Sequence, residues 1–203
     1  MNYIFCDFET TSSNPYHAEA IEAYFEVRDK DRFVLDKYHF KSKVNNWSDE
    51  AEAIHKISYN EHVMFDDKKV AWKKLYEWLN KQPDFTFICY VNHTMYGEDV
   101  WYDHAVLCME LMDYLGVNSM NNVLLNMKDK ISAYDVAKKC QKLGHFDKYE
   151  NFKQENVYYA IFDRKPRDSH RAVSDVKAMI DIYYWCLDAL ENKTTKRNQM
   201  QLL

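Results

Sequence analysis

The hydrophobic pattern of the chain is strand-like up to residue 41 and helix-like beyond it. Apolar or alternating runs at 3–6, 20–27 and 32–41 predict three strands. The polar triplet at 29–31 separates the last two runs and is short enough for a hairpin turn. We therefore expect the second and third strands to be antiparallel neighbours.

Helical spacing dominates the next part of the chain. Ser48 is expected to cap a short helix that ends at His55, and apolar residues at 70, 71, 75, 78 and 79 mark one face of a longer helix that ends before Pro83. A compact apolar run at 85–91 predicts a buried strand. A polar loop at 92–99 and a helix through Leu115 are expected to follow it.

The C-terminal third continues the alternation of strands and helices. A short strand is expected at 131–134, and Asp135 as N-cap and Gly144 just past the end bracket a helix over 136–143. After a polar and aromatic connection, Asp168 or Ser169 is expected to cap a last helix, whose apolar face runs from 172 to 187. Such an alternation predicts an α/β protein.

The composition is that of a globular protein, with 47% hydrophobic and 29% charged residues in a chain of 203. The length, without internal repeats or a long linker, predicts one domain over 1–203 with a frayed polar tail over 191–203. The formal net charge of −5 repels a polyanion. Any contact with nucleic acid therefore has to come from local basic groups or bound cations.

The cysteines and the N-terminus indicate the cellular compartment. Five cysteines in apolar surroundings, without CxxC spacing, are typical of buried free thiols in a reducing compartment. The N-terminus lacks the basic segment of a signal peptide, and no apolar run approaches the about 18 residues of a membrane span. We expect a cytoplasmic protein without membrane contact, and the low content of Gly and Pro suggests a bacterial or phage source.

Two acidic residues end the first predicted strand. Asp7 and Glu9 are two positions apart, which puts both carboxylates on one face of a strand, where they can bind a cation together. Such pairs are also common at hydrophilic strand edges, so the pair alone does not identify a metal site. Its position favours one, because the carboxyl ends of strands commonly line the crevice of an open α/β sheet.

A second group of candidate residues lies at the start of the last predicted helix. His170 precedes Asp175 by five residues. A histidine side chain suits proton abstraction near neutral pH, and a nearby carboxylate can hold a metal. An exposed helix start is the alternative for this group alone. The neighbours Lys165, Arg167 and Arg171 either contact phosphates or form a solvated basic surface.

Asp103 is the one acid inside the strongly apolar stretch from Val100 to Leu107. A carboxylate that is buried there needs a partner, and a metal ion can supply one. The alternative is that Asp103 lies on an exposed helix edge together with Glu110 and Asp113.

In combination, these motifs resemble the DnaQ-like, or DEDDh, 3′→5′ exonuclease family of the ribonuclease H-like superfamily. The stretch from Asp7 to Thr10 is similar to the family's DxET motif, and the stretch from His170 to Asp175 is similar to its HxAxxD motif. Asp103 stands in an aromatic-Asp-x-x-x-Leu context like that of the second motif. The resemblance covers nearly the whole chain.

Some positions depart from the family pattern. The usual His-Asn before the second motif reads Asn92-His93, a longer polar spacer follows, and Tyr102 replaces a phenylalanine. These departures leave Asp99 as an alternative to Asp103 for the acid of the second motif.

The resemblance implies a ribonuclease H-like α/β fold, in which a central five-stranded mixed sheet flanked by helices brings the acids together. It also implies that two divalent ions, Mg²⁺ or Mn²⁺, are held by Asp7, Glu9, Asp103 and Asp175, with His170 as the general base and Glu9 also orienting water. Oxygen ligands suit these ions. Two such ions stabilise the attacking and leaving oxygens of phosphodiester hydrolysis and turn an acidic pocket into a phosphate site.

The resemblance further implies a pocket for the terminal nucleotide. By analogy with the family, its lining residues are Phe8, Thr10, Ile54 and His55, with Ile54 against the base. The alternative is that Phe8 and Ile54 are core residues and that His55 is a satisfied helix-end histidine.

The implied activity is the release of nucleoside 5′-monophosphates from the 3′ end of single-stranded or frayed DNA. An exoribonuclease similar to oligoribonuclease or RNase T is a second possibility, because nothing in the motifs reads the 2′-hydroxyl. A non-catalytic module that binds nucleic acid or docks on a polymerase is the alternative from another class. A homodimer, or a replication or repair partner, is also open.

Overall fold

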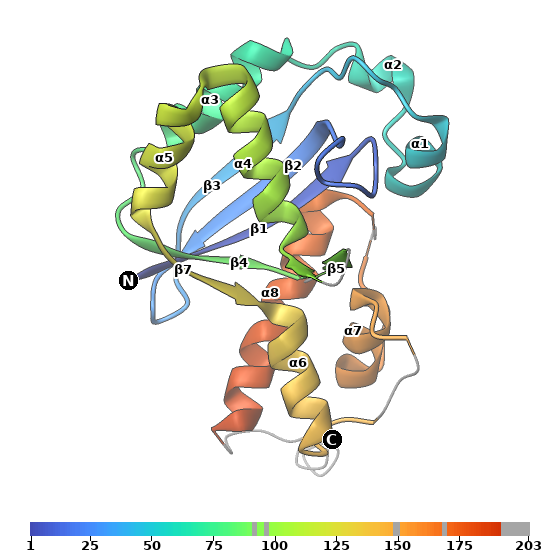
Figure 1. Cartoon of the computed structure of the whole chain (residues 1–203). Coiled ribbons are helices and arrows are strands. Elements are labelled where there is room, and N and C mark those ends of the chain that lie inside the picture. The colour runs from blue at the N-terminus through green and yellow to red at the C-terminus, as the bar shows by residue number, and fades with distance from the viewer. Residues whose placement is uncertain (91–92, 96–97, 148–150, 168–169, 192–203) are drawn as a thin grey trace.

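The computed structural model describes residues 1–90, 93–95, 98–147, 151–167 and 170–191, and for 93–95 and 98–100 it describes the backbone alone. A five-stranded mixed sheet with the order β3-β2-β1-β4-β7 forms the centre (Figure 1). The first three strands form an antiparallel meander, and β4 and β7 continue the sheet in parallel with β1. These strands are β1 (Asn2–Thr10), β2 (Ala20–Arg28), β3 (Val34–Lys41), β4 (Phe85–Cys89) and β7 (Met127–Ser132). The predicted α/β class and mixed sheet are confirmed.

Helices cover both faces of the sheet. One hydrophobic core lies between the sheet and α3, α4 and α5, and a second lies between the sheet and α6, α7 and α8. The helices are α1 (Asp49–His55), α2 (Tyr59–His62), α3 (Lys68–Leu79), α4 (Tyr102–Leu115), α5 (Val117–Asn126), α6 (Ala133–Lys142), α7 (Gln154–Phe162) and α8 (Ala172–Leu190). The antiparallel strands β5 (His93–Met95) and β6 (Glu98–Val100) form a separate two-stranded sheet, which overlaps the stretch 92–99 that the sequence predicted as a loop.

The alternation along β1 assigns its residues to the two cores. Ile4, Cys6 and Phe8 belong to the core under α3 and α4, whereas Phe5 belongs to the core under α8. Because side chains of a strand point to opposite faces in turn, Asp7 and Glu9 follow Phe5 on the α8 side. The apolar part of the strand thus anchors two carboxylates at its carboxyl end.

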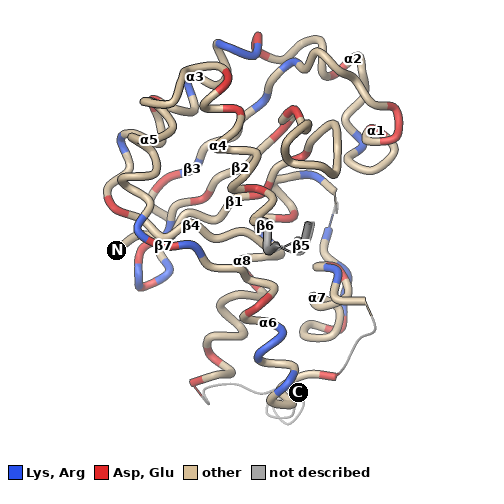
Figure 2. The backbone as a smooth tube through the Cα atoms, in the orientation of Figure 1, with Lys and Arg blue, Asp and Glu red and all other residues tan. Residues whose placement is uncertain are grey.

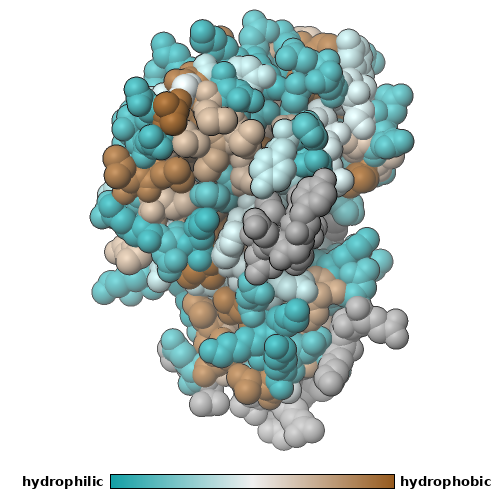
Figure 3. Space-filling model, viewed as in Figure 1, coloured by the Kyte–Doolittle hydropathy of each residue, from teal (hydrophilic) through white to brown (hydrophobic). Residues whose placement is uncertain are grey.

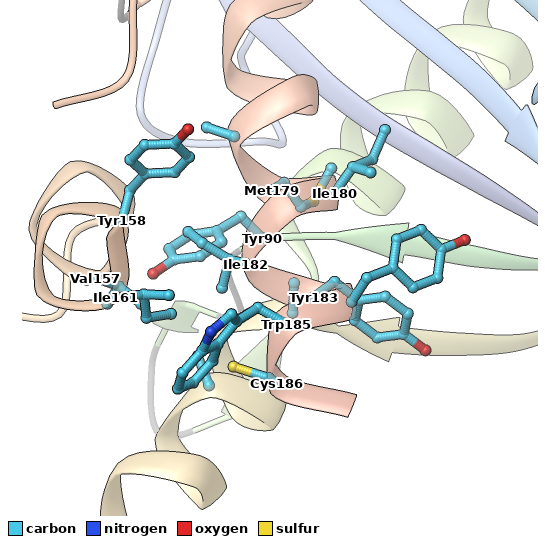
Figure 4. Packing of buried hydrophobic residues seen from close by; sticks show 14 of the residues in the cluster. Tyr90, Val157, Tyr158, Ile161, Met179, Ile180, Ile182, Tyr183, Trp185 and Cys186 are labelled. Atoms are coloured by element: carbon cyan, nitrogen blue, oxygen red, sulfur yellow. The ribbon is translucent and has the colours of Figure 1, made fainter. Parts of the chain in front are cut away.

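The helix α8 is buried along most of its length because it packs against the sheet, α6 and α7. Figure 4 shows side chains of α7, α8 and Tyr90 gathered in one cluster. The ring of Phe5 makes edge contacts with Tyr183 and Tyr184, at centroid distances of 5.5 and 5.6 Å. This packing fixes the position of the N-terminal turn of α8 relative to β1.

Several local predictions are confirmed. Ser48 caps α1 by accepting a hydrogen bond from the Ala51 N–H, and β2 and β3 are antiparallel neighbours. Gly144 follows α6 with a φ of 79°, a left-handed conformation that glycine adopts without strain.

Other local predictions were wrong. Ser132, not Asp135, is the N-cap of α6, because the Ser132 side chain accepts the Asp135 N–H at 3.1 Å. The strand predicted at 131–134 is β7, which begins at Met127. Arg171 stands at the N-cap of α8, and the predicted caps Asp168 and Ser169 lie outside the described residues, as does the predicted tail beyond 191.

Three helices, α2, α5 and α7, were not predicted. The missed α7 has apolar residues at Val157, Ala160 and Ile161, all buried, in the i, i+3, i+4 spacing of one helix face. Interleaved polar and aromatic residues obscured this spacing.

The surface is largely hydrophilic on the face that Figure 3 presents, with hydrophobic side chains gathered over α5. Val117 and Leu125 of α5 are 52% and 69% exposed. All five cysteines are free thiols, and four of them are buried. Among the described helices, none is long and apolar enough to cross a bilayer.

Candidate functional site

Three acidic side chains meet where β1 passes the start of α8. Asp7 and Glu9 come from β1 and Asp175 from the first turn of α8, and one carboxylate oxygen of each lies within 4.8 Å of the others. The sequence separates Asp175 from the strand acids by more than 160 residues, and the packing of α8 on the sheet brings them together. We call these three residues the carboxylate cluster.

Asp103 lies beside this cluster at the start of α4. It is buried, and it accepts a hydrogen bond from the Phe8 N–H at 3.2 Å. Asp7, Asp103 and Asp175 line one cavity of about 320 Å³, which we call the acidic cavity. The side chain of the alternative residue Asp99 lies outside the described residues. Asp103 therefore has a backbone partner and also faces the cluster.

His170 lies at the rim of the acidic cavity. The side chain lines the cavity, and the residue is exposed to solvent. Its backbone N–H donates to Asp175 Oδ2 at 2.9 Å, and its φ of 69° is in the left-handed region. A non-glycine residue with this φ carries about 1 kcal/mol or more of strain, which the hydrogen bond to the cluster offsets. The strained turn holds the imidazole beside the carboxylates.

Burial and mutual repulsion disfavour the ionised form of the acids in and beside the carboxylate cluster. Burial raises the pKa of Asp7 well above its ordinary range, and the charges of Glu9, Asp103 and Asp175 add to that shift. Burial and the charges of Asp175 and Glu22 raise the pKa of Glu9 to about 8. Burial likewise raises the pKa of Asp103 to about 7 and that of Asp175 to about 6. A divalent cation would relieve this repulsion, and an all-oxygen donor set suits Mg²⁺ or Mn²⁺.

A fifth acid, Glu22, is neutralised within the protein. It is fully buried on β2 and directly opposite Glu9 in the β1–β2 register. Arg171 donates two hydrogen bonds of 3.0 Å to its carboxylate, and His39 Nε2 lies 2.9 Å from it. Burial alone raises the pKa of Glu22, but the hydrogen bonds from His39 and Arg171 outweigh it and lower the pKa to about 2.

Arg171 therefore does not belong to a solvated basic surface around His170. Its guanidinium also donates to Glu61 Oε1 at 3.0 Å, so it ties the start of α8 to both β2 and α2. The guanidinium of Arg171 thus has partners within the protein, and its contact with phosphates stays a prediction.

A second cavity of about 440 Å³ adjoins the first, because Phe8 and Tyr102 line both. Hydroxyl side chains of Thr10, Thr11, Ser12, Ser13 and Ser48 line it, and we call it the hydroxyl-rich cavity. The Thr10 hydroxyl lies 2.6 Å from the Tyr102 hydroxyl, and the Tyr102 hydroxyl donates to the Ser12 carbonyl. Tyr102 thus stands between the two cavities.

The structure places the four predicted nucleotide-binding residues around this second cavity in different ways. Thr10, Ile54 and His55 line it, and Ile54 is 59% exposed, so Ile54 is not a core residue. Phe8 also lines it, but its ring is 6% exposed and packs edge-on against Phe25 at 5.6 Å. Phe8 is thus mainly a core residue whose backbone holds Asp103.

His55 has one satisfied and one unsatisfied ring nitrogen. Its Nδ1 accepts the Ile57 N–H at 3.0 Å, so Nε2 carries the proton of the neutral ring. Burial lowers the pKa of His55 to about 4, which keeps the ring neutral at physiological pH. Within the described part of the chain, the buried Nε2 has no hydrogen-bond partner. A buried donor without a partner is expensive and points to a ligand at this cavity.

Several residues of the site were not predicted from the sequence. Tyr90 and the start of α7, with Lys153, Gln154 and Glu155, also line the acidic cavity. The Gln154 side chain donates to the Asp175 carbonyl at 2.7 Å, which fixes α7 against the start of α8. The helical spacing of Val157 and Ile161 was the one signal that could have revealed this wall.

Comparisons with known proteins bear on the fold. No family model matches the sequence, and no curated protein matches it. Among solved structures, E. coli exonuclease I in complex with a dT13 oligonucleotide is similar, with a TM-score of 0.76 and 16% identity over 99% of this chain and 43% of that chain. The zinc-bound form of the E. coli exonuclease I complex with single-stranded DNA gives 0.77 and 17% over 100% and 45%.

The fold is ribonuclease H-like, as in exonuclease I. Exonuclease I is a DnaQ-like enzyme of the DEDDh type, so the fold that the resemblance implied is confirmed. A complex of exonuclease I with the peptide SSB-Ct is also similar, with a TM-score of 0.73 and 16% identity over 100% of this chain and 46% of that chain. This chain spans less than half the length of exonuclease I in these structures.

Proposed function

We propose that this chain is a metal-dependent 3′→5′ exonuclease that removes nucleoside 5′-monophosphates from the 3′ end of single-stranded or frayed DNA. The observation that supports this most strongly is the meeting of Asp7, Glu9 and Asp175 at the acidic cavity, which Asp7 and Asp175 line together with Asp103 and His170. These five residues come from β1, α4 and the segment at the start of α8, and they are the five that the family resemblance assigns to catalysis. An adjoining hydroxyl-rich cavity is available for the terminal nucleotide.

The acids of the site fit a pair of divalent cations. Asp7, Glu9, Asp103 and Asp175 would hold them, since all four donate oxygen, and burial raises the pKa of each. When bound, the ions supply positive charge at the oxygens that gain negative charge during phosphodiester hydrolysis.

The protein's own groups then divide the remaining work. His170, exposed at the rim and tied to Asp175 through its backbone, is placed to take a proton from the attacking water. Glu9, a member of the carboxylate cluster, orients that water. Tyr102, which lines both cavities, stands between the reacting phosphate and the nucleotide that leaves.

The hydroxyl-rich cavity gives the enzyme its preference for a strand end. Ile54 presents an exposed apolar side chain to the base, and His55 offers its unpartnered Nε2–H as a donor. The hydroxyls of Thr10 and Tyr102 both donate to the Ser12 carbonyl, which orders this wall of the cavity.

DNA is the proposed substrate because the similar structures of E. coli exonuclease I hold dT13 and other DNA oligonucleotides. No single side chain described around the hydroxyl-rich cavity distinguishes the 2′-hydroxyl of RNA from its absence in DNA. The test therefore includes RNA as a separate substrate. The non-catalytic binding module is the outcome that the test has to exclude.

The test is a time course on 5′-labelled and 3′-labelled single strands of DNA and RNA, with Mg²⁺, Mn²⁺ or EDTA. The proposal expects stepwise shortening of the 5′-labelled DNA, immediate mononucleotide release from the 3′ label, and no reaction in EDTA. His170→Gln is expected to lower the rate by about 100-fold or more.

The matched control is His145→Gln, which replaces a half-buried histidine next to α6 that does not line the acidic cavity. It should keep the full rate. Faster degradation of RNA than of DNA would change the substrate class. Tight binding of either polymer without cleavage would overturn the nuclease proposal in favour of a binding module.

A further inference from the structure

A third cavity, of about 490 Å³, lies where the end of α7 and the segment after it meet α8. Its lining includes four basic side chains, one acid and one tyrosine: Arg164, Lys165, Arg167, Lys177, Asp181 and Tyr158. We call it the basic cavity. Figure 2 shows Lys and Arg positions in blue along the chain beside α7.

The charge of the basic cavity is opposite to that of the molecule. The whole chain carries a formal charge of −5, yet four cations face one carboxylate here. Within the described part of the chain, Lys165, Arg167 and Lys177 form no ion pair. Like charges that gather without internal partners repel one another, so the cavity favours an anion from outside the protein.

One of these cations is held in position by neighbouring side chains. Tyr158 is 6% exposed, and its hydroxyl donates to Asp181 Oδ2 at 3.2 Å. Arg164 Nη2 in turn donates to the Tyr158 hydroxyl at 3.4 Å. The chain from Asp181 through Tyr158 to Arg164 presents a guanidinium, which is the side chain best suited to pair with phosphate oxygens.

The basic cavity and the acidic cavity share the same two helices. Ser174, Lys177 and Ala178 of α8 line the basic cavity, and Asp175 between them belongs to the carboxylate cluster. Ala178 lies three residues after Asp175, which is about 4.5 Å along a helix axis. Residues of the same two helices therefore line both the acidic cavity and the basic cavity.

We propose that the basic cavity binds a backbone phosphate of the single strand whose 3′ end occupies the acidic cavity. This inference rests on the proposed function. The apolar side chains described in the lining, Pro166 and Ala178, are small. The cavity therefore offers charge to a phosphodiester and little contact area to the apolar residues of an acidic peptide.

The proposal makes substrate length decisive. A dinucleoside monophosphate has only the scissile phosphate, so it has none left for the basic cavity. A longer strand has further phosphates and gains the additional contact. Each such contact also releases condensed counterions and makes binding more sensitive to salt.

The test compares kcat/KM for a long single strand of DNA and for a dinucleoside monophosphate in the variant Lys165→Ala/Lys177→Ala. Both side chains are exposed, so the variant is expected to fold. We expect kcat/KM for the long strand to fall by about tenfold or more and its salt slope to decrease by about 0.7, the value for one phosphate contact on a single strand. Cleavage of the dinucleoside monophosphate should keep its rate.

The control variant is Lys69→Ala/Lys73→Ala, which removes the same charge from exposed positions on α3. It should leave kcat/KM unchanged for both substrates. Arg164→Ala provides a second measurement, with the same pattern of loss for the long strand and retained cleavage of the short one.

An equal loss in the α3 control would show a general charge effect and would overturn the proposal. An unchanged kcat/KM and salt slope in Lys165→Ala/Lys177→Ala would also overturn it and would direct attention to an acidic protein segment as the ligand. Failure of the proposed function is distinguishable from both, because the unmodified protein would then cleave neither substrate.

Discussion

Glu22 and Glu9 face each other across two paired strands, and their surroundings treat the two charges in opposite ways. Glu22 is held by Arg171 and His39, which lower its pKa to about 2. Glu9 belongs to a cluster of three carboxylates, and burial together with neighbouring charges raises its pKa to about 8. Of these two neighbouring acids, Glu22 has its charge balanced by side chains of the protein. The charge of Glu9 is not balanced in this way and can be compensated by a bound cation.

The difference separates a structural acid from the acids that we propose as metal ligands. A buried ion pair such as Arg171 with Glu22 fixes the position of a segment, here the turn that carries His170. Acids that are buried together without such a pair destabilise the fold unless a ligand compensates for their charge. Proteins accept such strain at sites where a ligand binds.

The largest expected effect comes from a substitution in the carboxylate cluster. Asp7→Asn keeps the shape and removes one charge of the cluster. We expect nuclease activity to fall by about 1,000-fold or more, since charge stabilisation at the reacting phosphate depends on the metal ligands. Titration of Mn²⁺ by calorimetry should show weakened binding.

The comparison variant is Glu22→Gln, which removes the neighbouring structural charge. It should retain Mn²⁺ binding, because Glu22 is not part of the carboxylate cluster. Equal loss of metal binding in both variants would contradict the division into structural and functional acids.

The second largest effect is expected from removing the ion pair between Arg171 and Glu22. Arg171→Met removes two hydrogen bonds to the buried carboxylate of Glu22, and we expect the free energy of unfolding to fall by about 3 kcal/mol. Denaturant unfolding in EDTA measures it without a contribution from metal. Adding Glu22→Gln to the same protein should recover part of the loss, because the unpaired charge is then gone.

An exposed ion pair serves as its control. Lys43 lies 2.9 Å from Asp67 with both side chains more than 40% exposed, and Lys43→Met should change the unfolding free energy by about 0.5 kcal/mol or less. If Arg171→Met lowers the free energy of unfolding no more than Lys43→Met does, the ion pair between Arg171 and Glu22 does not stabilise the fold.

A third effect is the pH dependence of the metal-free protein. The pKa of Glu9 is raised in the folded state, so the folded form holds this proton more tightly than the unfolded form. Its contribution to stability is therefore complete below the ordinary pKa of about 4.5 and is lost as the pH rises through about 8. We expect the free energy of unfolding in EDTA to fall by an amount on the order of 2 kcal/mol from about pH 5 to about pH 8.

Glu9→Gln should flatten this dependence, and Mg²⁺ should restore the stability of the unmodified protein at about pH 8 by binding the folded state alone. Thermal unfolding of both proteins in EDTA and in Mg²⁺ measures these changes. A steeper decline in Glu9→Gln than in the unmodified protein would contradict the sign of this argument.

The smallest effect concerns the hydroxyl-rich cavity. Ile54 is 59% exposed, so Ile54→Ser should leave the stability nearly unchanged. The loss of apolar contact with a base should raise KM about fivefold, which corresponds to about 1 kcal/mol, with kcat retained. Leu125→Ser, at the 69% exposed residue of α5, is the matched control and should leave KM unchanged. A decrease in kcat with KM unchanged would assign Ile54 a different role.

Local sequence features predicted much of the sheet and the first half of the chain. The apolar runs before Asp7 and at 20–27 specified β1 and β2, because alternation along a strand is a property of neighbouring residues. The caps at Ser48 and Gly144 were readable for the same reason. The helices α5 and α7 were not, since their burial depends on the elements that pack against them.

The candidate site was predictable as a set of residues and not as an arrangement. The motifs around Asp7, Asp103 and His170 predicted which residues are candidates for binding metal and accepting a proton. They could not show that Arg171 turns away from the strand end to neutralise Glu22, nor that Phe8 serves the core while Ile54 remains exposed. Each of these outcomes depends on contacts between residues that are far apart in sequence.

By itself, the sequence determined the α/β class, the strand that ends in two acids and the helix that begins beside His170, because period and capping act over a few residues. Only the tertiary structure decided which acids share a cavity, which acid is paired with an arginine, and where unpaired cations gather beside α7. The physical reason is that burial and charge interactions depend on distance in space, and the packing of α8 against β1 sets those distances.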